Sequence, residues 1–256
     1  MMNFTLSNQV QIPAVGIGTF MMTPDQAEQA HLVVDALACG YRMIDTAQAY
    51  MNERAVGRGI KRSGVAREDI FISTKIWASQ YLTEGTVEKS LELLGTDYID
   101  LMFIHQPAGD FMAGYRKLET VAIRPMVNQI EMHPYFAQES ALKVMEEYQI
   151  VPEAWAPLGG GRHNPFDNEM VKEIAAAHGK TVGQVVLRWN VQRGVVVIPK
   201  SVHKARIEEN FQIWDFTLTE EEMQKISSLD LGYQGTAVKH FDPEFVKMCN
   251  IRKIHE

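Results

Sequence analysis

The 256-residue chain contains few cysteines, only Cys39 and Cys249. They stand near opposite ends of the chain and show none of the spacings that metal ligands have. We predict two reduced thiols, which excludes a small scaffold held by disulfides and a structural zinc site. No metal is expected.

The chain also lacks an excess of positive charge, because 25 Lys and Arg residues face 32 Asp and Glu residues and give a net charge of −7. Proteins that bind nucleic acid usually carry a basic excess, so no nucleic-acid partner is expected. The amino terminus has no basic segment followed by an apolar stretch, and no apolar run is long enough to span a bilayer. We therefore expect no membrane partner and a cytoplasmic location.

What the chain does contain is a regular alternation of short apolar runs and stretches with helical spacing, the pattern of repeated βα units on a parallel sheet. No linker, low-complexity tract or charge run divides it, so a single domain over residues 1–256 is predicted. After a hairpin around residues 7–9, strands are predicted at 15–19, 42–45, 70–75, 99–105, 126–131, 151–156 and 195–200. Helices are predicted at 24–39, 53–63, 83–94, 112–119, 138–148, 167–177, 181–192, 204–211 and 219–228, the last with Thr219 and Glu222 in capping-box spacing.

Polar residues end three successive predicted strands, in the order Asp45, Lys75 and His105. In a parallel barrel the carboxyl ends of the strands form the mouth at which chemistry takes place. Packing explains these residues poorly, because buried charges cost free energy unless they are paired. Each alone has a plainer explanation, such as a turn cap for Asp45, a core histidine for His105 or a half-buried helix-start residue for Tyr50. The coincidence of the four favours a site.

Three further segments bear on ligand binding. GIGTF, residues 16–20, is close to a dinucleotide fingerprint, but the third glycine would fall at Met21, so that interpretation fails. PLGGGRH, residues 157–163, is either a mobile connector or a phosphate cradle. IPKSVHKARIEEN, residues 198–210, gathers Lys200, Lys204 and Arg206 at a strand end and a helix start. That placement suits a phosphate.

Together these motifs resemble those of one family. GYRMIDTAQAY at 40–50, the lysine that closes FISTK at 71–75, the histidine in IDLMFIHQP at 99–107, VNQIEMHP at 127–134 and IPKSVHKARIEEN resemble the aldo-keto reductases, particularly bacterial members like the 2,5-diketo-D-gluconate reductases. The resemblance covers nearly the whole chain. It implies an α/β fold, a (β/α)8 TIM barrel with an N-terminal hairpin, that binds NADPH or NADP across its mouth without a Rossmann fold.

The resemblance also implies a reaction, the transfer of a hydride from NADPH to a small-molecule carbonyl substrate, an aldehyde, ketone or keto-sugar. The catalytic tetrad would be Asp45, Tyr50, Lys75 and His105, with Tyr50 as the general acid. A lysine ammonium favours the phenolate of a nearby tyrosine, whose ordinary pKa is about 10. Asp45 would keep Lys75 charged, and His105 would orient the carbonyl.

Binding residues follow from the same resemblance. Trp155 would stack on the nicotinamide and Gln129 would hold its carboxamide, while the 2′-phosphate would fall to Lys200, Ser201 and Arg206. The implied cofactor-binding residues are Gly18, Thr19, Phe20, Asp45, Gln129, Trp155, Leu158, Lys200, Ser201, Arg206, Glu209 and Asn210. The implied substrate-binding residues are Phe20, Trp77, His105 and Gln106. We expect a monomer or a weak oligomer.

One part of the family pattern is missing. Where family members continue through the rest of a helix, a fifth strand ending in Gly-x-Ser-Asn-Phe and another helix, KLETVAIRPMVNQIE passes directly from helix to strand. The fifth βα unit is therefore absent from the sequence, together with a Ser-Asn pair that would hold the nicotinamide carboxamide. Either the chain has lost the unit, or the sequence passes over a disordered segment. We favour the second explanation, which predicts a Cα–Cα step well above ~3.8 Å between Leu118 and Arg124.

Two other functions stay open. The first is a barrel that binds a nucleotide without catalysis, as a sensor or a subunit, and the intact tetrad argues against it. The second is a Schiff-base aldolase that uses Lys75, which borohydride trapping would reveal and which does not need the cationic segment at 198–210. Carbonyl reduction is the favoured hypothesis.

Overall fold

A computed structural model describes residues 2–22, 25–119, 125–160, 163–232 and 242–254. The chain forms two compact units. Unit 1 consists of Met1–Ile17 and Pro125–Ala237, and unit 2 consists of Gly18–Arg124 and Val238–Glu256. The single domain over residues 1–256 stays a prediction.

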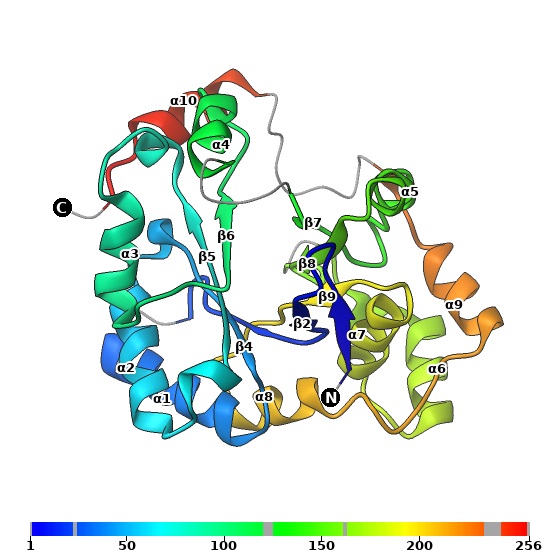
Figure 1. Ribbon diagram of the computed structural model, residues 1–256. Helices are drawn as coiled ribbons and strands as arrows, with labels where there is room; N and C mark the ends of the chain where they lie inside the picture. Colours follow the sequence, from blue (N-terminus) through cyan, green and yellow to red (C-terminus); the bar gives the residue numbers. More distant parts are fainter. Residues whose placement is uncertain (1, 23–24, 120–124, 161–162, 233–241, 255–256) are drawn as a thin grey trace. The chain divides into compact units, whose positions relative to one another are not determined.

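Unit 2 is built on a four-stranded sheet with the order β3-β4-β5-β6, in which β4, β5 and β6 run side by side (Figure 1). Its strands are β3 (Ile17–Gly18), β4 (Met43–Asp45), β5 (Phe71–Ile76) and β6 (Leu101–Ile104). The parallel register places Asp45 beside Ser73, and Lys75 beside Phe103. All six residues of β5 are buried, as expected for a central parallel strand covered on both faces.

The helices of unit 2 pack closely at two glycines. A Cβ on Gly59 would lie 2.7 Å from the Ala30 carbonyl oxygen, and one on Gly57 would lie 2.1 Å from that of Leu94. Only glycine allows α2 to approach α1 and α3 this closely. The helical segments are α1 (Gln26–Ala38), η1 (Gln48–Tyr50), α2 (Glu53–Ser63), η2 (Arg67–Asp69), η3 (Ala78–Gln80), α3 (Thr86–Leu94), α4 (Phe111–Glu119) and α10 (Pro243–Ile251).

The carboxyl-terminal segment packs against the strand ends of unit 2. Helix α10 begins after Asp242, whose side chain accepts a hydrogen bond from the Glu244 N–H, with Pro243 in the first turn. One buried hydrophobic cluster joins the end of β5, η3 and α10; its buried members are Ala49, Ile76, Trp77, Ala78, Tyr81, Ala108, Cys249 and Ile254. This contact brings residues from the end of the chain to the predicted site.

Unit 1 contains the amino-terminal hairpin and a parallel sheet with the order β7-β8-β9. In the predicted hairpin, β1 (Asn3–Thr5) pairs antiparallel with β2 (Gln11–Pro13). The sheet strands are β7 (Val127–Glu131), β8 (Val151–Trp155) and β9 (Val196–Val197), and Val15 forms a parallel bridge with Val197. The helical segments are α5 (Glu139–Glu147), η4 (Pro165–Asp167), α6 (Glu169–His178), α7 (Val182–Gln192), α8 (Lys204–Phe211) and α9 (Glu220–Ser227).

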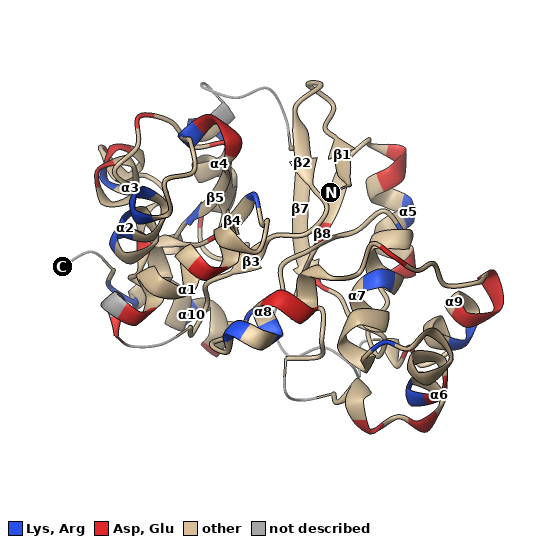
Figure 2. Cartoon of the chain, turned by 90° about the horizontal axis from the view of Figure 1, so that it is seen from below, with Lys and Arg blue, Asp and Glu red and all other residues tan. Residues whose placement is uncertain are grey.

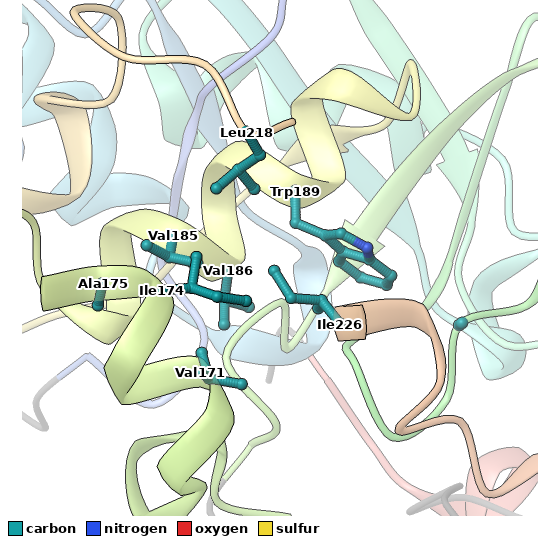
Figure 3. Packing of buried hydrophobic residues seen from close by; sticks show 9 residues of the cluster. Val171, Ile174, Ala175, Val185, Val186, Trp189, Leu218 and Ile226 are labelled. Carbon is teal, nitrogen blue, oxygen red and sulfur yellow. The ribbon is translucent and has the colours of Figure 1, made fainter. Parts of the chain in front are cut away.

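The core of unit 1 lies where α6, α7 and α9 meet (Figure 3). Trp189 of α7 is fully buried, and its indole N–H donates to the Ser227 hydroxyl at 3.1 Å. The predicted capping box of Thr219 and Glu222 is confirmed at the start of α9. Replacing a buried Trp by Ala typically lowers the free energy of unfolding by about 3–5 kcal/mol, so Trp189 contributes substantially to the stability of unit 1.

Most predicted elements are found with shifted ends. The strand predicted at 195–200 is only Val196–Val197, because Pro199 has no N–H to continue the ladder. The helix predicted from residue 83 begins at Thr86, after Gly85 with φ 71°, and the start predicted at residue 24 lies outside the described residues. Helix α10 and the short helix η1 were not predicted. The prediction of a long Cα–Cα step falls on residues 120–124, outside the described part; β6 and β7 belong to different sheets.

Candidate active site

The centre of the site in unit 2 is an ion pair between Lys75 and Asp45. Lys75 Nζ donates to Asp45 Oδ2 at 2.5 Å and to the Thr46 carbonyl oxygen at 2.8 Å. Both charged side chains are 2% exposed. Asp45 ends β4 and Lys75 lies one residue before the end of β5, so adjacent parallel strands deliver the two groups to one edge.

Hydrogen bonds from hydroxyl and amide groups hold this pair and the residues next to it. Ser73, which shares a face of β5 with Lys75, donates its hydroxyl to Asp45 Oδ1 at 2.7 Å. The Thr46 hydroxyl donates to Asn52 Oδ1 at 2.7 Å, and Asn52 Nδ2 donates to the Thr19 carbonyl oxygen at 2.9 Å. Such a network holds the Asp45 carboxylate and the start of the following loop in one arrangement.

Tyr50 is brought to the ion pair by the short helix η1. Lys75 Nζ lies 5.1 Å from the centre of the Tyr50 ring. Gln48, fully buried in the same helix, donates its Nε2 to the Thr86 carbonyl oxygen and to the Ser90 hydroxyl, and its Oε1 accepts from the Trp77 N–H. These bonds tie η1 to α3 and to the end of β5.

His105 stands directly after β6, between two aromatic rings. Its ring centre lies 5.5 Å from that of Tyr50 and 5.0 Å from that of Trp77, with both pairs edge to face. Its Nδ1 is buried without a hydrogen-bond partner within the described residues. Burial, with the charges of Lys75 and Arg252 next, holds the pKa of His105 well below its ordinary value of 6.5. The imidazole is therefore neutral at pH 7, with one N–H to donate.

Aromatic and amide residues surround the four groups. Phe20 is 53% exposed, and its ring centre lies 5.0 Å from that of Tyr50. Trp77 is buried, and its indole N–H has no partner within the described residues. Gln106 adopts a positive φ of 72°, and its carbonyl oxygen accepts a hydrogen bond from the Tyr81 hydroxyl. The implied substrate-binding residues thus gather around Tyr50 and His105.

The implied cofactor residues are divided between the units. In unit 2, Gly18 ends β3, and the Thr19 N–H and hydroxyl both donate to the Asp45 carbonyl oxygen at 3.0 Å. In unit 1, Gln129 lies on β7 and Trp155 at the end of β8, partly exposed. Gln129 Nε2 donates to Glu153 Oε1 at 2.6 Å. This hydrogen bond fixes the orientation of the Gln129 side-chain amide, because its nitrogen must point toward Glu153.

The cationic segment follows β9 and enters α8, whose first turns carry positive charge and whose last turns carry negative charge (Figure 2). Lys200 and Arg206 are exposed, and neither forms an ion pair within the described residues. Ser201 is buried, and its hydroxyl accepts from the His203 N–H at 3.0 Å. Cations near a helix N-terminus are disfavoured by the helix dipole, so this end of α8 is suited to an anion.

The remaining implied residues have structural contacts. Glu209 accepts a hydrogen bond from the Thr181 hydroxyl at 2.8 Å, which links α8 to the start of α7. Asn210 is buried at the end of α8. Leu158 packs on the core of unit 1, and Ala156, before it, has a φ of 50°.

The Aldo/keto reductase family matches the chain at residues 14–122 and 112–231. The chain belongs to the aldo/keto reductase family. A 9,11-endoperoxide prostaglandin H2 reductase from Trypanosoma cruzi (strain CL Brener) is 42% identical over 257 residues, which cover 88% of this chain and 90% of the relative. A glyoxal reductase from Bacillus subtilis (strain 168) is 41% identical over 255 residues, covering 88% and 91%.

Solved aldo-keto reductases share the fold. One from Brucella melitensis has a TM-score of 0.82 at 38% identity, covering 90% of this chain and 99% of its own. One from Bombyx mori, in complex with NADP, has a TM-score of 0.85 at 29% identity, covering 96% of each chain. The chain therefore has the α/β fold with parallel sheets of this (β/α)8 family, as predicted, and it is an NADPH-dependent oxidoreductase that reduces small-molecule carbonyl compounds.

The comparisons also bear on the missing fifth unit. The two matched stretches meet at residues 112–122, where the sequence passes directly from helix to strand. The alignment with the Trypanosoma cruzi relative runs over 257 residues but takes in 88% of 256 residues here, which is about 225. About 32 positions of that relative thus lack a counterpart, close to the size of a βα unit with its connections. The absence of this unit stays a prediction, and these findings support it.

Some contributors to the site were not predicted. Ser73 was detectable, because alternation along a strand places it on the same face as Lys75. Gln48 and Arg252 gave no local signal, since their partners lie far away along the chain. Among the described residues Cys39 and Cys249 form no disulfide, and their reduced state stays a prediction. In the part of the chain that is described, no helix is long and apolar enough to cross a membrane.

Proposed function

We propose that Tyr50 protonates the substrate oxygen in this aldo-keto reductase and that Lys75, Asp45 and His105 make it able to do so. The observation that carries the proposal is the buried ion pair of Lys75 and Asp45 beside the Tyr50 ring. Bound NADPH supplies the hydride. Aldehydes, ketones and keto-sugars are the proposed substrates, and a cytoplasmic monomer or weak oligomer is the proposed form.

Lys75 acts on Tyr50 through its charge. An ammonium near a phenol stabilises the phenolate, which lowers the free energy of proton loss by about 1.4 kcal/mol for each pKa unit. Asp45 holds the ammonium in place through a charge-assisted hydrogen bond. Proton transfer to the developing alkoxide is then easier than from an isolated tyrosine.

His105 acts as a hydrogen-bond donor rather than as the acid. Its pKa lies well below the ordinary value because the ring is buried and faces two cations. A neutral imidazole keeps one N–H, which can hold a carbonyl oxygen near the Tyr50 hydroxyl. The adjacent Phe20 and Trp77 rings offer apolar surface to the rest of the substrate.

The residues of unit 1 fit the cofactor in chemistry. Lys200 and Arg206 are exposed cations without ion-pair partners within the described residues, which suits the 2′-phosphate of NADPH. Gln129 offers an amide to the nicotinamide carboxamide and is oriented by Glu153. Trp155, partly exposed at the end of β8, offers a face for stacking.

The geometry weighs against the two alternatives. An aldolase lysine must present a neutral, reachable amine, whereas Lys75 is 2% exposed and donates to Asp45 and Thr46. A non-catalytic barrel has no need to retain the tetrad, yet the ion pair, Tyr50 and His105 are assembled. Carbonyl reduction is the function that these contacts support.

The test is consumption of NADPH with a panel of aldehydes, ketones and keto-acids, in the wild type and in Tyr50→Phe. The substitution should lower kcat by ~10²- to 10⁴-fold and leave NADPH binding, followed by protein fluorescence, nearly unchanged. Tyr148→Phe, at a tyrosine 60% exposed in unit 1, is the matched control. Wild-type turnover in Tyr50→Phe would remove Tyr50 from the mechanism.

A further inference from the structure

Arg252, just after α10, brings a positive charge to the tetrad from the end of the chain. Its guanidinium donates to the Ala49 carbonyl oxygen at 2.9 Å and lies 5.4 Å from the Trp77 ring centre. Its own carbonyl oxygen accepts from the Ser79 hydroxyl at 3.1 Å. Arg252 is thus held beside the residue that precedes Tyr50.

The charges of Arg252 and Lys75 differ in whether a carboxylate pairs with them. Lys75 is neutralised by Asp45. Arg252 forms no ion pair with a carboxylate among the described residues, and Ala49 occupies only one of its five N–H donors there. The positive charge of Arg252 acts at the centre of the site. It is the third cause, behind burial and the charge of Lys75, that lowers the pKa of His105. Among the described residues the Arg252 charge is therefore not compensated by a carboxylate, and a bound anion would compensate it.

The distances limit where that anion would lie. The guanidinium carbon is 5.4 Å from the Trp77 ring centre, which is 5.0 Å from that of His105, so at most 10.4 Å separates the guanidinium from the His105 ring. A carbonyl held by His105 and an anion held by Arg252 can belong to one small molecule. The planar guanidinium matches a carboxylate in shape as well as in charge.

We infer that Arg252 binds a carboxylate of the substrate and selects carbonyl compounds that carry a carboxylate a few carbons from the reacting carbonyl. The inference rests on the proposed carbonyl reduction and names its substrate class. Arg252 is then a specificity-determining residue, because it touches the substrate away from the reacting atoms. An uncharged substrate of the same shape gains nothing from it.

The experiment compares two rigid aldehydes of matched shape, 4-carboxybenzaldehyde and its methyl ester, in the wild type, Arg252→Gln and Arg252→Lys. The ratio of kcat/KM for the acid to kcat/KM for the ester should fall at least ~10-fold in Arg252→Gln, the cost of losing a charged hydrogen bond. Arg252→Lys keeps the charge without the planar fork and should give an intermediate ratio. Lys247→Gln, at an exposed lysine of α10, is the control for the loss of one positive charge on this segment.

The outcomes separate the inference from the proposed function. If kcat/KM falls equally for the acid and the ester in Arg252→Gln, Arg252 only fixes the carboxyl-terminal segment. That result would overturn this inference and leave the proposed function standing. A ratio that falls equally in Lys247→Gln would do the same, since any surface charge would then suffice. No NADPH consumption with either aldehyde in the wild type would overturn the proposed reduction and this inference with it.

Discussion

Replacing Asp45 by Asn removes one charge from the buried ion pair and keeps the shape of the side chain. The Lys75 ammonium then stays 2% exposed without the carboxylate that lies 2.5 Å away in the wild type. Breaking a buried pair from one side costs about 3–5 kcal/mol of the free energy of unfolding, because the remaining charge is left uncompensated. The same cost is expected for Lys75→Met, which strands the Asp45 carboxylate.

The double variant should be less destabilised than the two single changes predict. Removing both charges together leaves no buried ion, and such replacements are often near neutral. We expect the loss in Asp45→Asn/Lys75→Met to fall short of the summed single losses by about 3 kcal/mol or more, the upper end of measured coupling energies. The shared contact with Ser73, whose hydroxyl donates to Asp45 Oδ1, survives in the amide.

Urea unfolding at neutral pH, followed by tryptophan fluorescence and far-UV circular dichroism, measures this cycle. Coincident transitions from the two probes support two-state analysis. Lys89→Met, which breaks an exposed pair with Glu92, is the control and should change stability little. Additive losses in the double variant would refute the reasoning, because the two charges would then not be compensating one another.

Arg206→Ala should weaken NADPH far more than NADH, since a charged hydrogen bond to the 2′-phosphate is worth about 1.5–3 kcal/mol; equal weakening in a titration of each cofactor would place Arg206 elsewhere. His105 has a pKa well below 6.5 in the folded chain, so the unfolded chain binds the extra proton and stability falls as the pH drops below 6.5. His105→Gln should reduce this acid loss in unfolding measurements made at about pH 7.5 and about pH 5.5, and an unchanged pH dependence would show that His105 titrates alike in both states.

The secondary structure of the long periodic segments was predicted from sequence almost completely. Helices α2 and α8 begin and end where they were predicted, at Glu53–Ser63 and Lys204–Phe211. The strands that end near Asp45, Lys75 and His105 were found because apolar runs bounded by polar residues mark buried parallel strands. The order of these strand ends predicts a site with Asp45, Lys75 and His105, whereas its interpretation as a catalytic tetrad with Tyr50 comes from the resemblance to the family.

The roles of Gln48 and Arg252 were not predicted, because they depend on contacts between residues far apart in the sequence. Gln48 meets Thr86 and Ser90, which lie 38 and 42 residues further along the chain, and Arg252 meets Ala49 across 203 residues. No local pattern reports such pairings, because they arise only when the strands and loops pack. Helix α10 is a different case, since Asp242 and Pro243 carried a readable start signal.

Gln48 has a consequence for how this enzyme can change its substrates. Its amide oxygen accepts from the backbone N–H of Trp77, while its amide nitrogen holds α3. Trp77, a proposed substrate-lining residue, and the helix that carries Tyr50 are therefore both held by the Gln48 side chain. A substitution that shifts the backbone at Trp77 would therefore also shift Tyr50, the proposed proton donor. New substrate preferences are then more accessible through exposed residues of the carboxyl-terminal segment such as Lys247, which lies outside the buried cluster around Trp77.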